Sequence, residues 1–212
     1  MSVKDDLSYR QLQAQATRER VAAAARRLFA ERGYVGTTVA AIGKAAGIAE
    51  PTVYKAFGNK KAILDEIRRV WIRDSEVRPL LAEAMAESDV RRRVDLAARW
   101  NRQQLERGYD VIMIYQEAAR ADPSIAEIWS QVLRGREREK KRFIEALANN
   151  LRHGLTAKTA TDLYVTLERP EIYAELVFDR GWSPEEYEAW LATTLKQQLL
   201  GEVRETKKVQ RR

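Results

Sequence analysis

The chain of 212 residues is 45% hydrophobic and 33% charged, carries a formal net charge of +7 and contains no cysteine, which excludes disulfides and thiolate metal sites. Its abundant Ala, Arg, Glu and Leu are strong helix formers and predict an all-α globular protein. The start, MSVKDDLSYRQLQ, has no apolar signal core and no run of 18 uncharged apolar residues occurs, so we expect a cytoplasmic protein with no membrane partner.

Positive charge is concentrated at the two ends of the sequence. Residues 1–75 hold 14 Lys and Arg against 8 Asp and Glu, whereas residues 76–200 hold 19 against 21 and residues 201–212 hold 5 against 2. A solvated surface is one explanation of a basic end. The other is that one small domain binds a polyanion, and we favour it on the motif described next.

Two helices are predicted near the N-terminus. Residues 18–33, RERVAAAARRLFAERG, place apolar residues at helical spacing and end at Gly33, a residue suited to the left-handed conformation. Thr37 and Thr38 then supply an N-cap for VAAIGKAA, which Gly47 closes.

A third, very short helix follows in EPTVYKAF. Its helical wheel buries only Val53 and Phe57, so Pro51, Thr52 and Lys55 face outward. Asn59 is positioned to cap a fourth helix that begins KKAILDEIRRVW. Two helices joined by a tight turn, the second short and exposed, are typical of a helix-turn-helix, whose second helix enters the major groove of DNA.

The stretch LFAERGYVGTTVAAIGKAAGIAEPTVYKAFGNKKAIL resembles the N-terminal domain of the TetR/AcrR family of bacterial transcriptional regulators, over about residues 18–66. Gly43 departs from the alanine usual in the family, and Ala49 from a common capping serine. The resemblance assigns Tyr54 and Lys60 to the DNA backbone and supports Glu50 as a base reader. The DNA-contact candidates are Thr38, Lys44, Glu50, Pro51, Thr52, Tyr54, Lys55 and Lys60.

The remaining sequence is helical throughout. A helix from Ser88 is expected to end at Gly108, and YDVIMIYQEAARA after it carries an apolar arc wide enough for a buried central helix. Asp122–Pro123 starts a long charged helix to about Asn149. Thr156 caps a helix that breaks near Pro170, and SPEE at 183–186 is a capping box that opens the last helix.

Aromatic residues are frequent in the middle of the chain. Ordinary core packing explains each one alone, but together they could line a ligand cavity between helices. The pocket candidates, including polar residues expected to face inward, are Trp71, Trp100, Gln104, Met113, Tyr115, Glu117, Trp129 and Tyr164.

The C-terminal region also resembles the dimerisation half of TetR-type regulators, which implies an interface near residues 156–168 and 184–200. The last helix carries an apolar stripe that a dimer would cover, although a single chain could equally bury it. The predicted interface residues are Tyr187, Trp190, Leu191, Leu195 and Leu199.

Catalysis is not expected. His153 is the one histidine, so with no cysteine present no metal site, cofactor site or nucleophile–base pair is indicated. The sequence therefore predicts four segments: a flexible arm (1–17), a helix-turn-helix DNA-binding domain (18–66), a helical effector-binding and dimerisation domain (67–200) and a basic tail (201–212).

The expected function is that of a ligand-responsive DNA-binding regulator. It would be a homodimeric repressor that binds a palindromic operator of double-stranded DNA and is released by a small lipophilic effector. The alternative is a helical interaction or scaffold protein with an idle helix-turn-helix. Salt-sensitive retention on DNA cellulose separates the two.

Overall fold

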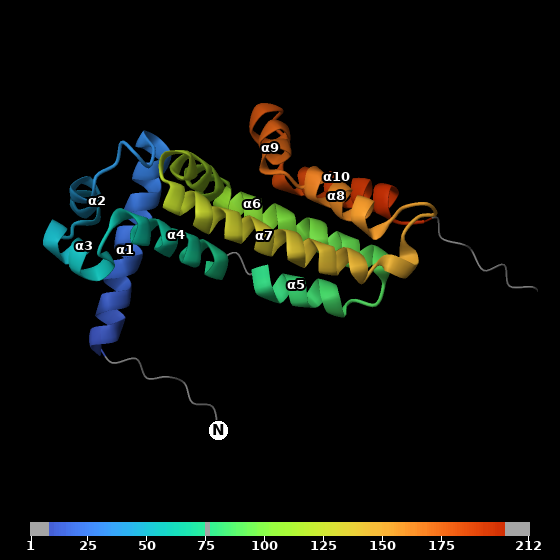
Figure 1. The fold of residues 1–212 in the computed structure, drawn as a ribbon, viewed down its shortest axis with the longest axis horizontal. Helices are drawn as coiled ribbons and strands as arrows, with labels where there is room; N and C mark the ends of the chain where they lie inside the picture. The colour runs from blue at the N-terminus through green and yellow to red at the C-terminus, as the bar shows by residue number, and fades with distance from the viewer. Residues whose placement is uncertain (1–8, 75–76, 202–212) are drawn as a thin grey trace, which may run out of the picture. The chain divides into compact units, whose positions relative to one another are not determined.

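The computed structural model describes residues 9–74 and 77–201. Within these ranges it contains ten α-helices and no β-strand, only an isolated bridge between Leu151 and Leu200 (Figure 1). The all-α prediction is confirmed. No helix in the described ranges is both long and apolar enough to cross a membrane.

The chain divides into two compact units. The first comprises Met1–Val77 and Glu106–Leu133, and the second Arg78–Leu105 and Arg134–Arg212. Helices of the first unit are α1 (Tyr9–Arg32), α2 (Val39–Ala46), α3 (Glu50–Phe57) and α4 (Lys60–Asp74). The second unit contains α8 (Ala157–Leu167), α9 (Pro170–Tyr173), α10 (Pro184–Leu199), a 3-10 turn η1 (Ala148–Asn150) and a π-helical turn η2 (Ala174–Asp179). The helix α5 (Val77–Ala86) follows the boundary, while α6 (Val90–Ala121) and α7 (Pro123–Glu145) contribute residues to both units.

The start of α1 differs from the prediction. The helix begins at Tyr9 rather than at residue 18, so residues 9–17 of the expected flexible arm are helical. Apolar periodicity could not reveal this N-terminal extension of the helix, because its apolar residues Tyr9 and Leu12 are exposed and do not pack in the core. Residues 1–8 of the arm, and 202–212 of the predicted basic tail, lie outside the described residues.

The predicted helix caps are largely confirmed. The hydroxyls of Thr38 and Thr156 each accept a hydrogen bond from the backbone N–H three residues on, both at 3.1 Å. Asn59 caps α4 in the same way, and Ser183 with Glu186 forms the complete capping box at the start of α10. One cap is shifted by a residue, since Asp89 rather than Ser88 accepts the first N–H groups of α6. These local signals depend only on neighbouring residues, which is why the sequence reveals them.

The helical backbone breaks at Gly108, where the sequence predicted a helix to end. Its φ of −157° and ψ of 23° are non-helical, so α6 consists of two helices joined by a kink at this residue. A Cβ at this position would lie 1.9 Å from Nε1 of Trp71, so any side chain would overlap the buried indole. Glycine is therefore needed here because α4 packs closely against it, and not because a turn requires it.

The first unit extends beyond the boundary expected at residue 66. The predicted central helix is buried as expected at Val111 and Ile112, and it contacts the N-terminal helices directly. The guanidinium of Arg26 on α1 holds Asp110 through two hydrogen bonds of 2.6 Å. The Tyr115 hydroxyl donates to the Leu64 carbonyl of α4 at 3.4 Å. These contacts join residues that are 51 and 84 positions apart in sequence, so no local pattern indicated them.

The apolar stripe of α10 is core of the second unit. Tyr187, Leu191, Leu195 and Leu199 are at most 1% exposed within the single chain. Tyr187 also donates to Oδ1 of Asn101 at 2.8 Å. The prediction that these four residues form a dimer interface is therefore wrong, because a partner could reach them only if the unit opened. Trp190 alone of the predicted five remains partly exposed.

Candidate nucleic-acid interface

The turn between α2 and α3 is tightly closed. Gly47 adopts the left-handed conformation (φ 66°, ψ 34°), and the Ile48 N–H donates to the Gly43 carbonyl at 2.9 Å. A Cβ at Gly43 would lie 2.7 Å from the Ile48 carbonyl oxygen. The glycine that departs from the family's alanine thus lies where the turn approaches α2 most closely.

Helix α3 is buried on one side only. Val53 and Phe57 pack inward, with exposures of 0% and 8%, as the helical wheel predicted. Its N-cap, Ala49, has no side-chain hydrogen bond to the helix, so the expected loss of a cap is confirmed. The candidates that remain on the solvent side are Glu50, Pro51, Thr52, Tyr54 and Lys55, all exposed.

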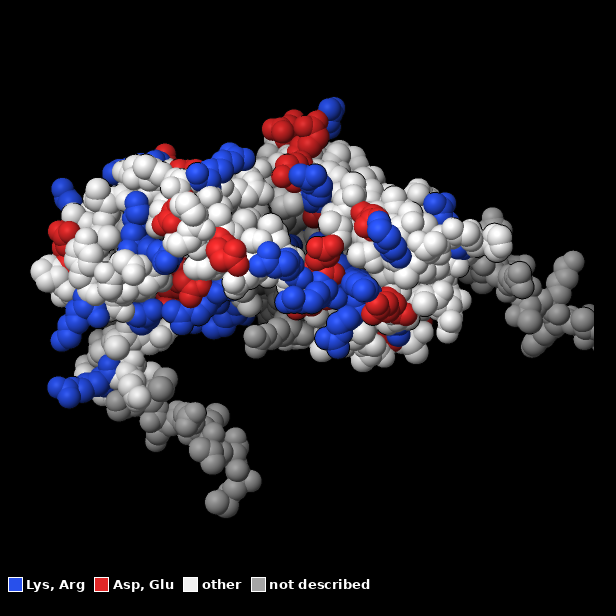
Figure 2. Space-filling view, in the orientation of Figure 1, with Lys and Arg blue, Asp and Glu red and all other residues white. Residues whose placement is uncertain are grey.

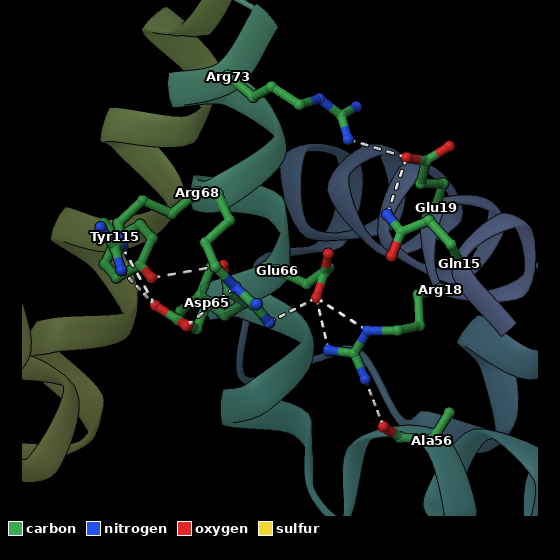
Figure 3. A network of polar contacts seen from close by, with 11 residues as sticks. Gln15, Arg18, Glu19, Ala56, Asp65, Glu66, Arg68, Arg73 and Tyr115 are labelled. Atoms are coloured by element: carbon green, nitrogen blue, oxygen red, sulfur yellow. Dashed lines mark hydrogen bonds and ion pairs between the residues drawn. The ribbon is translucent and has the colours of Figure 1, made fainter. Parts of the chain in front are cut away.

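Arg18 of α1 holds α3 from its buried side (Figure 3). Its guanidinium donates to the Ala56 carbonyl at 2.5 Å, near the C-terminus of α3, and lies 4.2 Å from the centre of the Phe57 ring. The same guanidinium forms an ion pair of 2.5 Å with Glu66 of α4, whose side chain is 6% exposed. A cation is favourable at a helix C-terminus, so this contact stabilises α3 and fixes its position.

Glu66 is the anion on which this arrangement depends. Its Oε2 also accepts from Arg69 at 2.6 Å, so two guanidinium groups share one nearly buried carboxylate. Sequence reasoning missed both Arg18 and Glu66. The available signal was a carboxylate within the apolar face of KKAILDEIRRVW, which in a helix that packs on others indicates a buried partner of opposite charge.

The Lys60 side chain is hydrogen-bonded within the protein and is not simply free to contact the DNA backbone. Its ammonium donates to the carbonyls of Tyr34 and Thr37, at 2.7 and 3.0 Å, and lies 4.3 Å from the centre of the Tyr34 ring. Burial lowers the pKa of Lys60, although the nearby Glu117 carboxylate opposes this effect. An ammonium group has three N–H donors, so one remains for DNA. The contact of Lys60 with DNA phosphate stays a prediction. Its two hydrogen bonds show a separate role, which is to hold the loop before α2.

The same loop is held from α6. Oε1 of Glu117 accepts from the Tyr34 N–H at 3.0 Å, and the hydroxyl of Thr37 donates to the Gly33 carbonyl at 2.8 Å. This loop leads to Thr38 at the start of α2, which is exposed. The carboxylate of Glu117 is thus engaged with the DNA-binding motif, and does not face a pocket as predicted.

The charge on this part of the first unit is suited to a polyanion. Lys44 on α2 and Lys55 on α3 are both exposed, and Arg20 donates to the Ala46 carbonyl at the end of α2 at 2.7 Å. Figure 2 shows Lys and Arg side chains projecting around these helices with Asp and Glu interspersed. The position of Lys44 opposite the buried face of α2 is as the sequence indicated.

The predicted pocket residues fall into two groups. Trp71, Met113, Tyr115, Glu117 and Trp129 belong to the first unit, where Tyr115 stacks on Trp129 with ring centres 5.0 Å apart. Burial raises the pKa of Tyr115 to about 12. Trp100, Gln104 and Tyr164 belong to the second unit, where all three are buried. The structure does not assign the eight residues to one site.

Residues 21–67 match the family model described as bacterial regulatory proteins, tetR family. These residues form a DNA-binding domain of the TetR family. Among curated proteins, the chain is 32% identical over 92 residues to the HTH-type transcriptional repressor KstR2 of Rhodococcus jostii (strain RHA1). That match covers 42% of this chain and 44% of the relative, so the chain spans less than half of that protein's length.

Solved structures share the fold over most of the chain. A putative transcriptional regulator from Saccharomonospora viridis, in complex with choline, has a TM-score of 0.70 at 20% identity, covering 89% of this chain and 100% of the other. The regulator FadR from Bacillus subtilis, in complex with stearoyl-CoA, has a TM-score of 0.67 at 18% identity, covering 84% and 96%. At such identities the likeness shows the fold alone.

Proposed function

We propose that this TetR-family chain is a transcriptional repressor that binds a palindromic operator as a homodimer and is released by a small-molecule effector. The observation that supports it best is the geometry of α3. Arg18 and two apolar residues hold this short helix from one side, and its other side presents polar side chains to solvent.

The exposed face offers donors and acceptors that match base edges. The Lys55 ammonium can donate to the O6 and N7 acceptors of guanine, the Thr52 methyl can contact a thymine methyl, and the Glu50 carboxylate can accept from a cytosine amino group. Contacts to phosphate position the helix without reading sequence, and for these we propose Tyr54, Lys44 and Lys60, with Thr38 at the N-terminus of α2.

Replacing Lys55 by alanine tests the base-reading role. Selection from random duplexes is expected to yield a palindromic consensus for the unaltered protein, and Lys55→Ala is expected to cost roughly 1–3 kcal/mol of binding and relax preference at one base pair in each half-site. Lys61→Ala is the matched control, because it changes the charge by the same amount. The Lys61 ammonium donates a hydrogen bond to the Ser124 hydroxyl at 3.1 Å. If Lys55→Ala weakens binding to all sequences alike, Lys55 contacts phosphate; if no salt-sensitive binding to any duplex occurs, the scaffold alternative stands.

The dimer is proposed because one short helix reads too few base pairs for specificity. A two-fold dimer would present two copies of α3 about 34–36 Å apart, one turn of DNA. Helices α8 and α10 pack side by side in the second unit (Figure 1), and with the α10 stripe buried inside, their outward faces are the proposed interface. Trp190 and Thr193 lie on the accessible part of α10.

The quaternary prediction is that the chain sediments as a dimer at micromolar concentration without DNA. Thr193→Arg, which places a charge on the proposed interface, is expected to shift it to monomer while the circular dichroism spectrum is preserved. Arg138→Glu on the exposed face of α7 serves as the control. A monomeric unaltered protein, or a Thr193→Arg dimer of undiminished stability, would contradict this interface.

The effector is proposed from the relatives' ligands and from the buried residues of the second unit. The similar structures contain choline or stearoyl-CoA, which differ in charge and size, so they indicate a ligand-binding fold without naming this chain's ligand.

A further inference from the structure

The interior of the second unit contains an unusual group of polar side chains. Arg136 and Lys140 of α7, Tyr164 of α8 and Glu168 just after α8 come together with Gln104 of α6, and Trp100 lies one helical turn before Gln104. Tyr164 is fully buried, while Trp100, Lys140 and Glu168 are 3%, 7% and 3% exposed. We call these six residues the interior polar cluster.

Contacts connect the cluster but leave it incompletely satisfied. Arg136 donates to Oε1 of Gln104, and Lys140 forms an ion pair with Glu168. The Lys140 ammonium also lies 5.9 Å from the centre of the Tyr164 ring. Trp100 lies one helical turn before Gln104, on the same face of α6. Three helices thus contribute side chains to one region of the core.

Three hydrogen-bond donors in the cluster have no partner, and neither carboxylate oxygen of Glu168 accepts a hydrogen bond there. Among the described residues, nothing accepts from the indole N–H of Trp100, from Nε of Arg136 or from the hydroxyl of Tyr164. Burial raises the pKa of Tyr164, so its hydroxyl keeps its proton at neutral pH and can donate. Buried donors without partners are costly, and a core built only for stability would use apolar residues at these positions.

The charge of the cluster is also unbalanced. Lys140 is matched by Glu168, whereas Arg136 has no carboxylate within ion-pair distance in the part of the chain that the structure describes. The exposed Glu139 acts on Arg136 only through space. Arg136 is partly exposed but its Nε is buried, and a cation withdrawn from water normally has an anion beside it. One negative charge with acceptor oxygens beside Arg136 would therefore balance its guanidinium and accept from the donors that have no partner.

We propose that the interior polar cluster binds the carboxylate of a small organic acid with an apolar body, and that this acid is the effector. The second part rests on the proposed function. One oxygen of the carboxylate can accept from Arg136 Nε, and the other oxygen can accept from the Tyr164 hydroxyl or the Trp100 indole N–H. Each oxygen has two lone pairs for such bonds. The neighbouring Phe143, whose ring centre lies 5.5 Å from that of Tyr164, together with the Trp100 indole, suits an apolar body.

The test uses matched acid and amide probes and the full chain without DNA. Calorimetric titration with benzoate, octanoate and hexadecanoate, each beside its amide, is expected to show at least one acid binding about tenfold or more tightly than its amide. Tyr164→Phe, which deletes one buried oxygen, is expected to weaken that acid about tenfold, and Arg136→Gln about a hundredfold. Arg138→Gln, an exposed change on the same helix, is expected to leave affinity within about twofold.

The outcomes separate the site from the regulation. No preference for the acid in any pair, or equal weakening by Arg138→Gln, would overturn the site. If Arg136→Gln fails to fold, Tyr164→Phe decides, because the removal of one hydroxyl keeps the ring packing. Finally, operator affinity is measured with and without the bound acid. Acid binding that leaves operator affinity unchanged would support the site and refute the effector role, whereas failure to bind DNA would refute the proposed function alone.

Discussion

Glu66→Gln is expected to lower the free energy of unfolding of the first unit by about 2–4 kcal/mol, because it removes the charge that two guanidinium groups share. The Glu66 side chain is 6% exposed, and Arg18, a quarter exposed, cannot reach an equivalent anion while it also donates to Ala56. Urea unfolding followed by circular dichroism and by tryptophan fluorescence measures the loss.

A second consequence of Glu66→Gln concerns DNA. Since Arg18 joins Glu66 to the end of α3, weaker positioning of α3 is expected to reduce operator affinity even under conditions where the unit is folded. Glu19→Gln is the control: its ion pair with Arg73, also visible in Figure 3, is about half exposed on both sides and is expected to contribute less than about 1 kcal/mol. Equal effects of the two substitutions would show that Glu66 has no special role.

Gly108→Ala is expected to destabilise the first unit by about 1–3 kcal/mol through overpacking. The added methyl would lie 1.9 Å from Nε1 and 2.2 Å from Cε2 of Trp71, and a buried indole cannot move aside as the end of a flexible side chain can. The φ of −157° is accessible to any residue, so the penalty comes from the contact and not from the backbone. Thermal and urea unfolding both measure it.

A double-mutant cycle makes the assignment to Trp71 specific. In a Trp71→Phe background, which removes the ring nitrogen, Gly108→Ala is expected to cost clearly less than in the native chain. Gly135→Ala on α7 is the matched control, because a Cβ there meets only Arg138 Nη2 at 4.0 Å. Since alanine has the higher helix propensity, this substitution is expected to stabilise the protein by up to about 1 kcal/mol. An unchanged penalty in the Trp71→Phe background would exclude the indole as its cause.

Much of the fold is predictable from local sequence. The caps at Thr38 and Asn59, the capping box at Ser183 and the burial of Val53 and Phe57 depend on residues within one or two helical turns, and the structure confirms them. The helix-turn-helix follows from such signals, because its two helices are adjacent in sequence. The TetR-family assignment follows from the same ordered positions.

The errors share a cause. The apolar stripe of α10 and the aromatic Trp71 are patterns that indicate burial without saying by what, so a dimer interface and a pocket wall are equally consistent with them. The structure places the stripe in the core of its own unit and the indole against Gly108. The helix end predicted at Gly108 is confirmed as a kink, but the sequence could not show that the close approach of Trp71 also requires a glycine there.

The sequence by itself determined that the chain is helical, that its N-terminal part contains a helix-turn-helix with α3 as its second helix, and which α3 residues face solvent, since helical periodicity and capping are short-range. Only the tertiary structure decided that Arg18 and Glu66 hold α3 and that Lys60 and Glu117 support the loop before α2. The same is true of the polar residues around Arg136 in the interior of the second unit. The physical reason is that charged and polar side chains gain most from partners brought near by packing, and those partners lie 23 to 83 residues away in sequence.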